Sequence, residues 1–233
     1  TAPKFDQRTD LHGYSCQKFQ RRCIFDLDGV VVDTAKYHYL AWKRLAAEHG
    51  FDFTEHDNER LKGVSRMASL EILLEIGQKS ASPQEKELMA ARKNAWYVEY
   101  IENMDPSEIL PGAQVFIENL RGRGIKVALG SASKNARLIL NRIGLVNHFD
   151  TIVDGTRVVN AKPNPEVFLI AASDLGVTPA ECLVFEDAEA GVEAAINGGM
   201  RCVGVGNPLV LSKANLVIDG FKNLSPNDIF DRV

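Results

Sequence analysis

The sequence predicts an α/β protein: a Rossmann-like parallel sheet with a helical domain inserted directly after its first strand. Short apolar runs recur along the chain and end in turn or acidic residues, as the buried strands of a parallel sheet do. Segments with apolar residues at helical spacing lie between these runs, and that alternation is typical of a parallel α/β sheet. The interval from about Thr34 to Asp105 differs, because it shows consecutive helical patterns and no convincing strand.

The predicted strands are short, apolar and followed by residues that can end them. The first strand, 22–25, leads into Asp26-Leu27-Asp28-Gly29, and the next, 125–129, leads into Gly130-Ser131-Ala132-Ser133. Three further strands are predicted at 182–185, 202–205 and 216–218.

Capping residues, proline and glycine mark the predicted helix boundaries. Asn164-Pro165-Glu166 starts a helix, with Asn as the cap, Pro in the first position and an acid in the first turn, and Gly176 ends it. Another helix spans 136–143, and the inserted region contains helices at 35–48, 67–75 and 84–103. The chain therefore divides into a polar amino-terminal arm (1–20), an α/β core (21–34 and 106–233) and a helical domain (35–105).

The composition excludes several classes of protein. The 233 residues include 27 basic and 31 acidic ones, for a net charge of −4, so nucleic acid is not a predicted partner. No apolar stretch approaches the ~18 residues of a membrane span, and the first twenty residues lack the apolar segment of a secretory signal. The four cysteines show neither metal nor redox spacing. We expect a cytoplasmic protein, with a monomer as the default.

Acidic residues gather where two of the predicted strands end. Asp26 and Asp28 follow the first strand, and Glu186 and Asp187 follow the 182–185 strand. Ligands of open α/β sheets bind outside the carboxyl ends of the strands, and carboxylates that repel one another there could share a Mg²⁺ ion. The structural alternatives are an Asp-Gly turn after the first strand and acidic residues that begin a helix after the other.

Two further residues could hold a phosphate beside these acids. Ser131 ends the 125–129 strand and opens the next helix, so its hydroxyl and the neighbouring N–H groups could bind a phosphate oxygen. Lys162 is a cation on the loop ahead of a capped helix. Singly, Ser131 could be a cap and Lys162 a solvated charge. Their coincidence with the acids at equivalent strand ends favours a phosphate site.

The segments FDLDGVVVDT, GSAS, AKPNP and FEDAEAG resemble, in order, the four motifs of the haloacid dehalogenase superfamily of phosphotransferases. The resemblance spans roughly residues 22–206 and implies that the helical insertion is that superfamily's cap domain. It also implies the site roles: Asp26 as nucleophile, Asp28 as general acid/base, Ser131, Ala132 and Lys162 on the transferring phosphate, and Glu186 and Asp187 completing a Mg²⁺ site with Asp26 and the Asp28 backbone carbonyl.

The predicted cap carries a second candidate phosphate site. Lys62-Gly63-Val64-Ser65-Arg66 is a Gly-containing turn at a helix start, where N–H groups, hydroxyls and a guanidinium could bind a phosphate. The alternative is a helix capped by Ser65 with one exposed Arg. A second phosphate site suits a mutase, which binds a bisphosphate in two orientations and protects its aspartyl phosphate from water.

Resemblance to the sugar phosphomutases of the superfamily implies roles for the remaining residues. Arg66 and Ser65 would hold the distal phosphate, and Thr34 and His38 would position Asp28 at the hinge. The other implied positions are Lys62, Gly63, Ser69 and Lys93 in the sugar pocket, Ser133, Lys134 and Asn135 on the core side of the ligand, and Trp42 near the hinge. Considered singly, these residues also have structural explanations: His38 could have a structural role, Trp42 could belong to the hydrophobic core, and Lys93 could be a solvated charge on a helix.

The function implied by this resemblance is Mg²⁺-dependent interconversion of β-D-glucose 1-phosphate and glucose 6-phosphate. It would proceed through an aspartyl phosphate and β-glucose 1,6-bisphosphate. One alternative is a phosphatase or pyrophosphatase with the same core, because both chemistries use an aspartyl phosphate. The other is a non-catalytic binding module, which the intact set of catalytic positions disfavours.

Overall fold

The core of the protein is a parallel β-sheet, as the sequence predicts. The computed structural model describes residues 22–61 and 64–233, so the predicted arm at 1–20 lies outside the described residues. Within them, six strands form one sheet in the order β3-β2-β1-β4-β5-β6, and every neighbouring pair is parallel. The strands are β1 (Arg22–Phe25), β2 (Val127–Gly130), β3 (Thr151–Val153), β4 (Cys182–Glu186), β5 (Arg201–Val205) and β6 (Leu216–Ile218). Five of them match the predicted strands closely, and β3 was not predicted.

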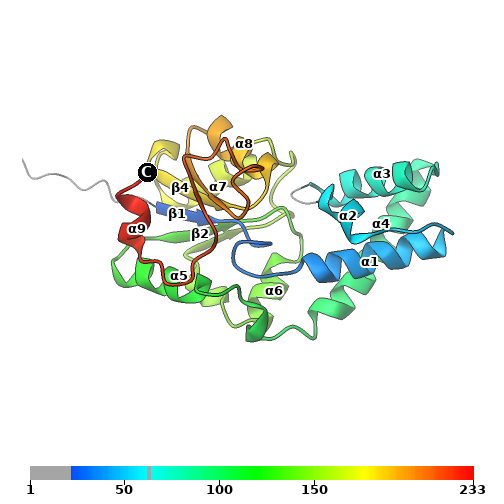
Figure 1. The fold of residues 1–233 in the computed structure, drawn as a ribbon, viewed down its shortest axis with the longest axis horizontal. Helices are drawn as coiled ribbons and strands as arrows, with labels where there is room; N and C mark the ends of the chain where they lie inside the picture. The colour runs from blue at the N-terminus through cyan, green and yellow to red at the C-terminus, as the bar shows by residue number, and fades with distance from the viewer. Residues whose placement is uncertain (1–21, 62–63) are drawn as a thin grey trace, which may run out of the picture.

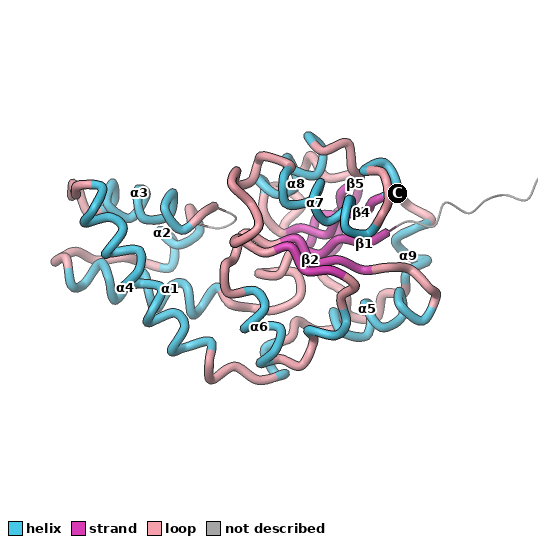
Figure 2. The backbone as a smooth tube through the Cα atoms, turned by 180° about the vertical axis from the view of Figure 1, so that it is seen from behind, coloured by secondary structure: helices cyan, strands magenta, loops and turns pink. Residues whose placement is uncertain are grey.

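Helices cover both faces of this sheet. In Figure 2, α5 (Ala113–Gly122) and α6 (Ala136–Arg142) lie on one side, and α7 (Glu166–Leu175) and α8 (Glu189–Asn197) lie on the other. A short α9 (Pro226–Phe230) near the end of the chain packs by α5. The alternation of side chains along β1 explains both layers, since Cys23 and Phe25 join one hydrophobic cluster and Ile24 joins the other.

Within the described residues, the helices α1 to α4 form a separate body beside the sheet (Figure 1). They are α1 (Ala35–Glu48), α2 (Glu55–Glu59), α3 (Arg66–Ile76) and α4 (Pro83–Ile101). Ser82 caps α4 with a capping box, and Pro83 occupies its first turn. The three long helices begin and end within two residues of the predicted bounds, whereas α2 was not predicted. None of the described helices is both long enough and apolar enough to cross a bilayer.

The start of α7 differs by one residue from the prediction. The helix begins at Glu166, and Pro165 rather than Asn164 takes the capping position. The Asn164 side chain still accepts a hydrogen bond from the Glu166 N–H at 3.0 Å, so it performs the function expected of a cap. Gly176 ends the helix in the left-handed region, with φ of 72°.

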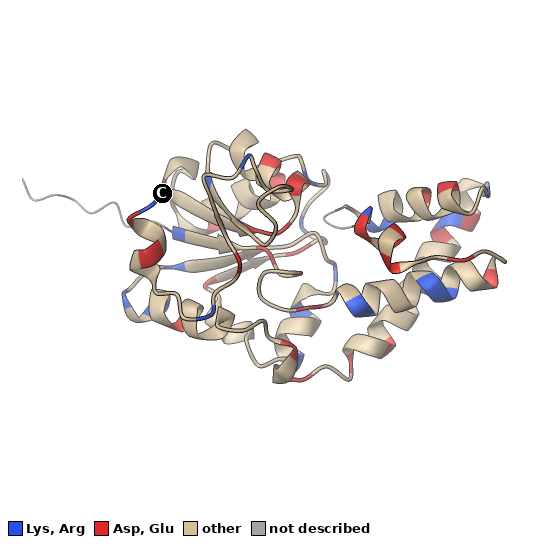
Figure 3. Ribbon diagram, viewed as in Figure 1, with Lys and Arg blue, Asp and Glu red and all other residues tan. Residues whose placement is uncertain are grey.

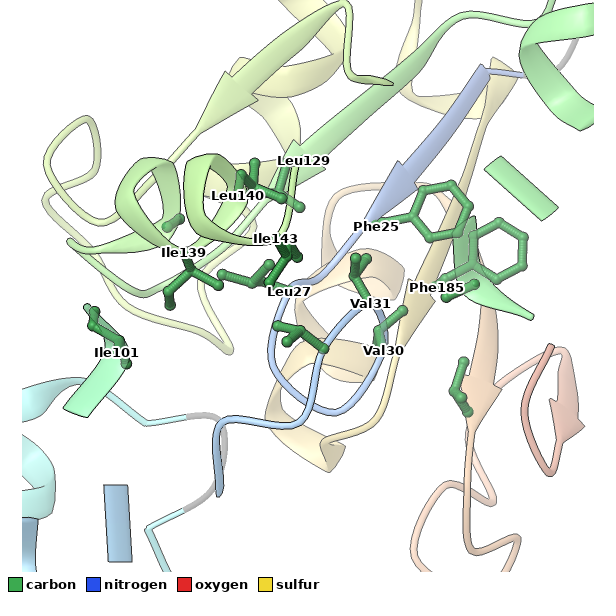
Figure 4. Close-up of a cluster of buried hydrophobic side chains, with 14 of the residues drawn as sticks. Phe25, Leu27, Val30, Val31, Ile101, Leu129, Ile139, Leu140, Ile143 and Phe185 are labelled. Carbon is green, nitrogen blue, oxygen red and sulfur yellow. The ribbon is translucent and has the colours of Figure 1, made fainter. Parts of the chain in front are cut away.

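An aromatic cluster supports the central strands. The rings of Phe25 and Phe185 stack with centroids 4.5 Å apart, and Phe116 and Phe221 close over them. Figure 4 shows Phe25 on β1 beside Phe185 on β4. Phe25 also pairs in register with Leu129 of β2. The residues that follow these three strands therefore emerge at one level, which is where the candidate site forms.

The two connections between the core and the helical body run side by side. Val32, before α1, forms an antiparallel bridge with Ile109, which follows the short 3₁₀ turn η1 (Pro106–Glu108). The Asp33 N–H donates to the Glu108 carbonyl at 3.2 Å, and the Leu110 N–H donates to the Val31 carbonyl at 3.0 Å. The helical body is thus attached through a short two-stranded ribbon.

Candidate active site

A buried lysine links the carboxylates at two strand ends. Lys162 Nζ donates to Asp26 Oδ1 at 2.5 Å and to Glu186 Oε2 at 2.8 Å. The side chains of Lys162 and Glu186 are only 3% and 1% exposed. Burial alone would lower the pKa of Lys162, but the two carboxylates outweigh it and raise that pKa, so the lysine is a fixed cation. The solvated-charge alternative for Lys162 is therefore wrong.

Asp26, Glu186 and Asp187 form a cluster suited to a divalent cation. Ligand oxygens from the three residues lie within 4.8 Å of one another. Burial, followed by repulsion from Glu186 and Asp26, raises the pKa of Asp187 well above its usual value. Two N–H groups fix Glu186 Oε1, those of Asp187 at 3.2 Å and Ala188 at 3.0 Å. Hard oxygen donors with a net negative charge are the ligands that Mg²⁺ prefers, so these residues fit such an ion.

Asp28 sits beside this cluster in a different environment. The Thr34 hydroxyl donates a hydrogen bond to its Oδ1 atom. Burial, and then repulsion by Asp26, raises the pKa of Asp28 to about 7, although Lys162 and Lys93 oppose the shift. A carboxyl that titrates near neutrality can both give and accept a proton, as a general acid/base must.

The loop after β2 supplies polar groups to the same region. Ser131 is 1% exposed, and its Oγ accepts a hydrogen bond from the Ser133 N–H at 3.1 Å. Ser133 Oγ in turn accepts from the Asn135 N–H at 3.2 Å. Ala132, Ser133, Lys134 and Asn135 line a cavity between the core and the helical body, whereas Ser131 is not among its lining residues.

A cavity of about 590 Å³ separates the core from the helical body. The core contributes Asp26, Asp28, Lys162, Glu186 and Asp187 to its lining. Figure 3 shows acidic residues along the edge of the core that faces the helices. Thr34, at the junction with the core, also lines the cavity, and the helical body contributes the predicted residues His38, Trp42, Ser65, Arg66, Ser69 and Lys93. Lys62 and Gly63, also predicted here, lie outside the described residues.

Lys93 is buried within the helical body. It is 2% exposed, its Nζ lies 2.9 Å from His38 Nδ1, and it faces the ring of Trp42 at 4.6 Å. Burial and the nearby Arg66 lower the pKa of Lys93 to about 7. Burial, and then the Lys93 charge, also lowers the pKa of His38, so a neutral His38 accepts from the lysine. The solvated-charge alternative for Lys93 is therefore wrong.

Ser65 caps the helix α3, as the structural alternative for this residue predicted. Its Oγ accepts a hydrogen bond from the Ala68 N–H at 3.3 Å. Arg66 follows it and is half-buried at the cavity wall, so it is not the exposed charge of that alternative. The capping function of Ser65 leaves Arg66 as the cation that this turn presents to the cavity.

Sequence reasoning missed several cavity residues on α4 and α2. Asn94 Oδ1 accepts a hydrogen bond from Asn135 Nδ2 at 3.0 Å and joins the helical body to the core. Tyr97 and Asn58 also line the cavity. A signal for Tyr97 was present, because it lies four residues after the predicted Lys93 on the same helix and therefore shares its face.

The fold, the lysine-linked carboxylates and the inserted helices define a class of phosphate-transferring enzymes. The chain belongs to the haloacid dehalogenase-like hydrolase family, whose model matches residues 21–199. It is 44% identical to β-phosphoglucomutase of Bacillus subtilis over 84% of this chain and 87% of that one. The crystal structure of β-phosphoglucomutase from Clostridium difficile superposes with a TM-score of 0.87 at 45% identity, covering 91% and 96% of the two chains. A phosphorylated-carbohydrate phosphatase of Thermotoga maritima is 32% identical over 89% of this chain and 95% of that one. The predicted family and fold class are confirmed.

Proposed function

We propose that this chain is a metal-dependent β-phosphoglucomutase. It interconverts β-D-glucose 1-phosphate and glucose 6-phosphate through an aspartyl phosphate and β-glucose 1,6-bisphosphate. One observation carries the proposal: a single cavity has the Asp26–Lys162 pair and Asp28 on its core side and Arg66 on its helical side. Such a cavity suits a sugar with a phosphate at each end. The identity to β-phosphoglucomutase supports the same activity.

In one half-reaction, Asp26 takes a phosphoryl group from the bisphosphate. A carboxylate oxygen of Asp26 attacks phosphorus, the bond from phosphorus to the sugar oxygen breaks, and Asp28 gives that oxygen a proton. Lys162 already lies 2.5 Å from Asp26 Oδ1, so it offsets repulsion between the carboxylate and the incoming phosphate. Ser131 and Ala132, after β2, would hold the transferring group.

In the other half-reaction, the sugar monophosphate takes the phosphoryl group back. Its free hydroxyl loses a proton to the Asp28 carboxylate, its oxygen attacks phosphorus, and Asp26 leaves as a carboxylate. The bisphosphate then turns end for end, with Arg66 and Ser65 holding the phosphate that is not reacting. Lys93, Ser69, Ser133, Lys134 and Asn135 would contact the sugar phosphate between these ends.

We propose Mg²⁺ as the metal. Asp26, Glu186, Asp187 and the Asp28 backbone carbonyl would hold it. When bound, a divalent cation offsets the negative charge on the phosphoryl oxygens. The cluster of oxygen donors beside Lys162 supports this assignment.

The alternative function is hydrolysis of a small sugar phosphate or pyrophosphate. Its support is the identity to a phosphorylated-carbohydrate phosphatase, because water can replace the sugar hydroxyl in the same half-reaction. The deciding experiment supplies β-glucose 1-phosphate, Mg²⁺ and a trace of the bisphosphate, with products followed by ¹H and ³¹P NMR. Glucose 6-phosphate without stoichiometric inorganic phosphate is expected from a mutase, and inorganic phosphate alone would refute it.

A labelling experiment tests the nucleophile. Asp26→Asn should abolish labelling of the protein by a ³²P-phosphoryl donor, because the amide oxygen is a poor nucleophile. Asp33→Asn is the matched control: Asp33 Oδ1 accepts a hydrogen bond from the Ala35 N–H at 3.1 Å, and an amide oxygen can replace that acceptor. Labelling that survives in Asp26→Asn would place the nucleophile elsewhere.

We further propose a cytoplasmic monomer that divides at 34/35 and 105/106 into an α/β core and a helical cap. Support for the location comes from Cys182 and Cys202, which are buried thiols outside any disulfide, as is usual in a reducing compartment. Support for the division comes from the helical body beside the sheet (Figure 1). Size-exclusion chromatography with light scattering tests the monomer.

A further inference from the structure

Tyr97 is a buried residue of the cavity wall that the mechanism above does not use. It lies on α4, is 1% exposed, and its hydroxyl makes no hydrogen bond of ordinary geometry. A buried hydroxyl without a partner costs free energy, so its presence here calls for a function or a partner. A core position alone would be served equally well by Phe.

The position of the Tyr97 ring is fixed by its neighbours. It stacks on the His38 ring with centroids 4.1 Å apart, and Lys93 Nζ lies 4.6 Å from its centre. His38 is one helical turn after Thr34, and its N–H donates to the Thr34 carbonyl at 3.1 Å. Stacking on His38 therefore brings Tyr97 to the start of α1, beside the residue that contacts Asp28.

A polar group that interacts with the Tyr97 hydroxyl supports the same geometry. The Thr34 hydroxyl interacts with it, although the two are not aligned as an ordinary hydrogen bond. Thr34 is fully buried and directs its own hydrogen to Asp28 Oδ1. Its oxygen therefore has lone pairs available for a donor, and Tyr97 is placed to supply one.

We propose that Tyr97 is a positioning residue that links the helical cap to the general acid/base: its hydroxyl donates to Thr34, which donates to Asp28. The inference rests on the proposed function, because it assigns Asp28 the proton transfer to and from the sugar oxygen. A small movement of α4 toward the core aligns the first hydrogen bond. The chain of donors then fixes the carboxyl of Asp28 when the cavity is closed around a substrate.

The test separates the two chemical steps. Labelling of Asp26 by acetyl phosphate needs no proton from Asp28, since acetate is a good leaving group, whereas transfer from the labelled enzyme to β-glucose 1-phosphate needs Asp28 as a base. In Tyr97→Phe, labelling should be unchanged and the kcat of transfer should fall about tenfold, the effect of losing one hydrogen bond, with little change in KM. Tyr100→Phe, on the same helix, is the matched control and should alter neither step.

A double-mutant cycle tests the route through Thr34. Thr34→Val removes the acceptor, so adding Tyr97→Phe to it should cost nothing further in the rate of transfer. The proposal is overturned if the two losses multiply, if Tyr97→Phe behaves like Tyr100→Phe, or if labelling and transfer fall together. Failure of the wild type to make glucose 6-phosphate would instead refute the proposed function. If the enzyme is a hydrolase, the effect of Tyr97→Phe can still be measured, as the rate at which phosphate is released from labelled Asp26.

Discussion

Replacing Gly29 with Ala should damage the metal site far more than the fold. Gly29 follows Asp28 with φ of 78°, and a methyl group there would overlap Oδ2 of Asp187. The carboxyl carbon of Asp187 lies 2.5 Å from the new methyl position and Oδ2 lies nearer still, so the carboxylate must retreat by more than about 0.9 Å to reach an ordinary contact of 3.4 Å. The obstacle is the end of a flexible side chain, which can move at small cost to folding.

Gly50→Ala provides the matched control for the backbone cost. Gly50 has φ of 77°, and a methyl group there would meet nothing within 4 Å. Both variants should lose roughly 1–2 kcal/mol of unfolding free energy, the cost of a left-handed conformation with a side chain. Only Gly29→Ala moves a carboxylate of the acidic cluster. Because Mg²⁺ tolerates little departure from octahedral geometry at about 2.1 Å, we expect that movement to remove a ligand.

The assay is a titration of activity with Mg²⁺, combined with urea unfolding in EDTA. Gly29→Ala should need on the order of 100-fold more Mg²⁺ for half-maximal activity, since even disturbing the residues that orient metal ligands costs 10–100-fold in affinity. Gly50→Ala should need the same Mg²⁺ as the wild type. Equal Mg²⁺ requirements in the two variants would refute the assignment of Asp187 as a ligand.

Three further predictions concern the charged groups. Lys162→Met should lower the unfolding free energy of the metal-free protein by about 3–5 kcal/mol at pH 8, because buried carboxylates lose their cation, and added Mg²⁺ should restore part of that stability. The control Lys213→Met removes an exposed ion pair and should change urea unfolding little. An equal loss of stability in both variants would contradict a stabilising buried Lys162. The pKa of Asp28 is raised to about 7, so the folded, metal-free protein binds this proton more tightly than the unfolded chain. The stability of the metal-free protein should then fall as pH rises from about 4 to 7, and Asp28→Asn should make this decrease, measured by thermal unfolding, smaller. The same dependence of stability on pH in the variant would contradict a raised pKa at Asp28. Arg66→Ala should impair turnover of the bisphosphate more than hydrolysis of acetyl phosphate, whereas equal losses would argue against a distal-phosphate site.

The sheet was predictable because buried parallel strands are apolar throughout and end abruptly. The run from Arg22 to Phe25 is followed at once by Asp26, and such a boundary is visible without tertiary information. β3 has only three residues, Thr151–Val153, which is too short for a pattern to distinguish it from a loop. The helix α5 has apolar residues spaced at 113, 116, 117 and 120, so it could have been predicted from that spacing.

The site was predictable where its residues follow strand ends, and less so where helices build it. Parallel strands in register bring Asp26 and Glu186 to one edge, so the sequence order of the motifs fixes their convergence. The burial of Lys93 depends instead on the packing of α1 against α4, which spacing along one helix does not determine. The same holds for Tyr97, whose contact with His38 joins two helices far apart in the sequence.

The paired connections at Val32 and Ile109 restrict how the two bodies can move. A body tied at a single point can swivel in any direction, whereas one tied through two hydrogen-bonded strands bends mainly across the plane of that ribbon. A relative movement of the two bodies would then follow one arc, along which α4 would keep its orientation toward Asp28. The two connections between the core and the helical body also lie side by side. The helical body could therefore be replaced by an insertion of different shape with the sheet left intact.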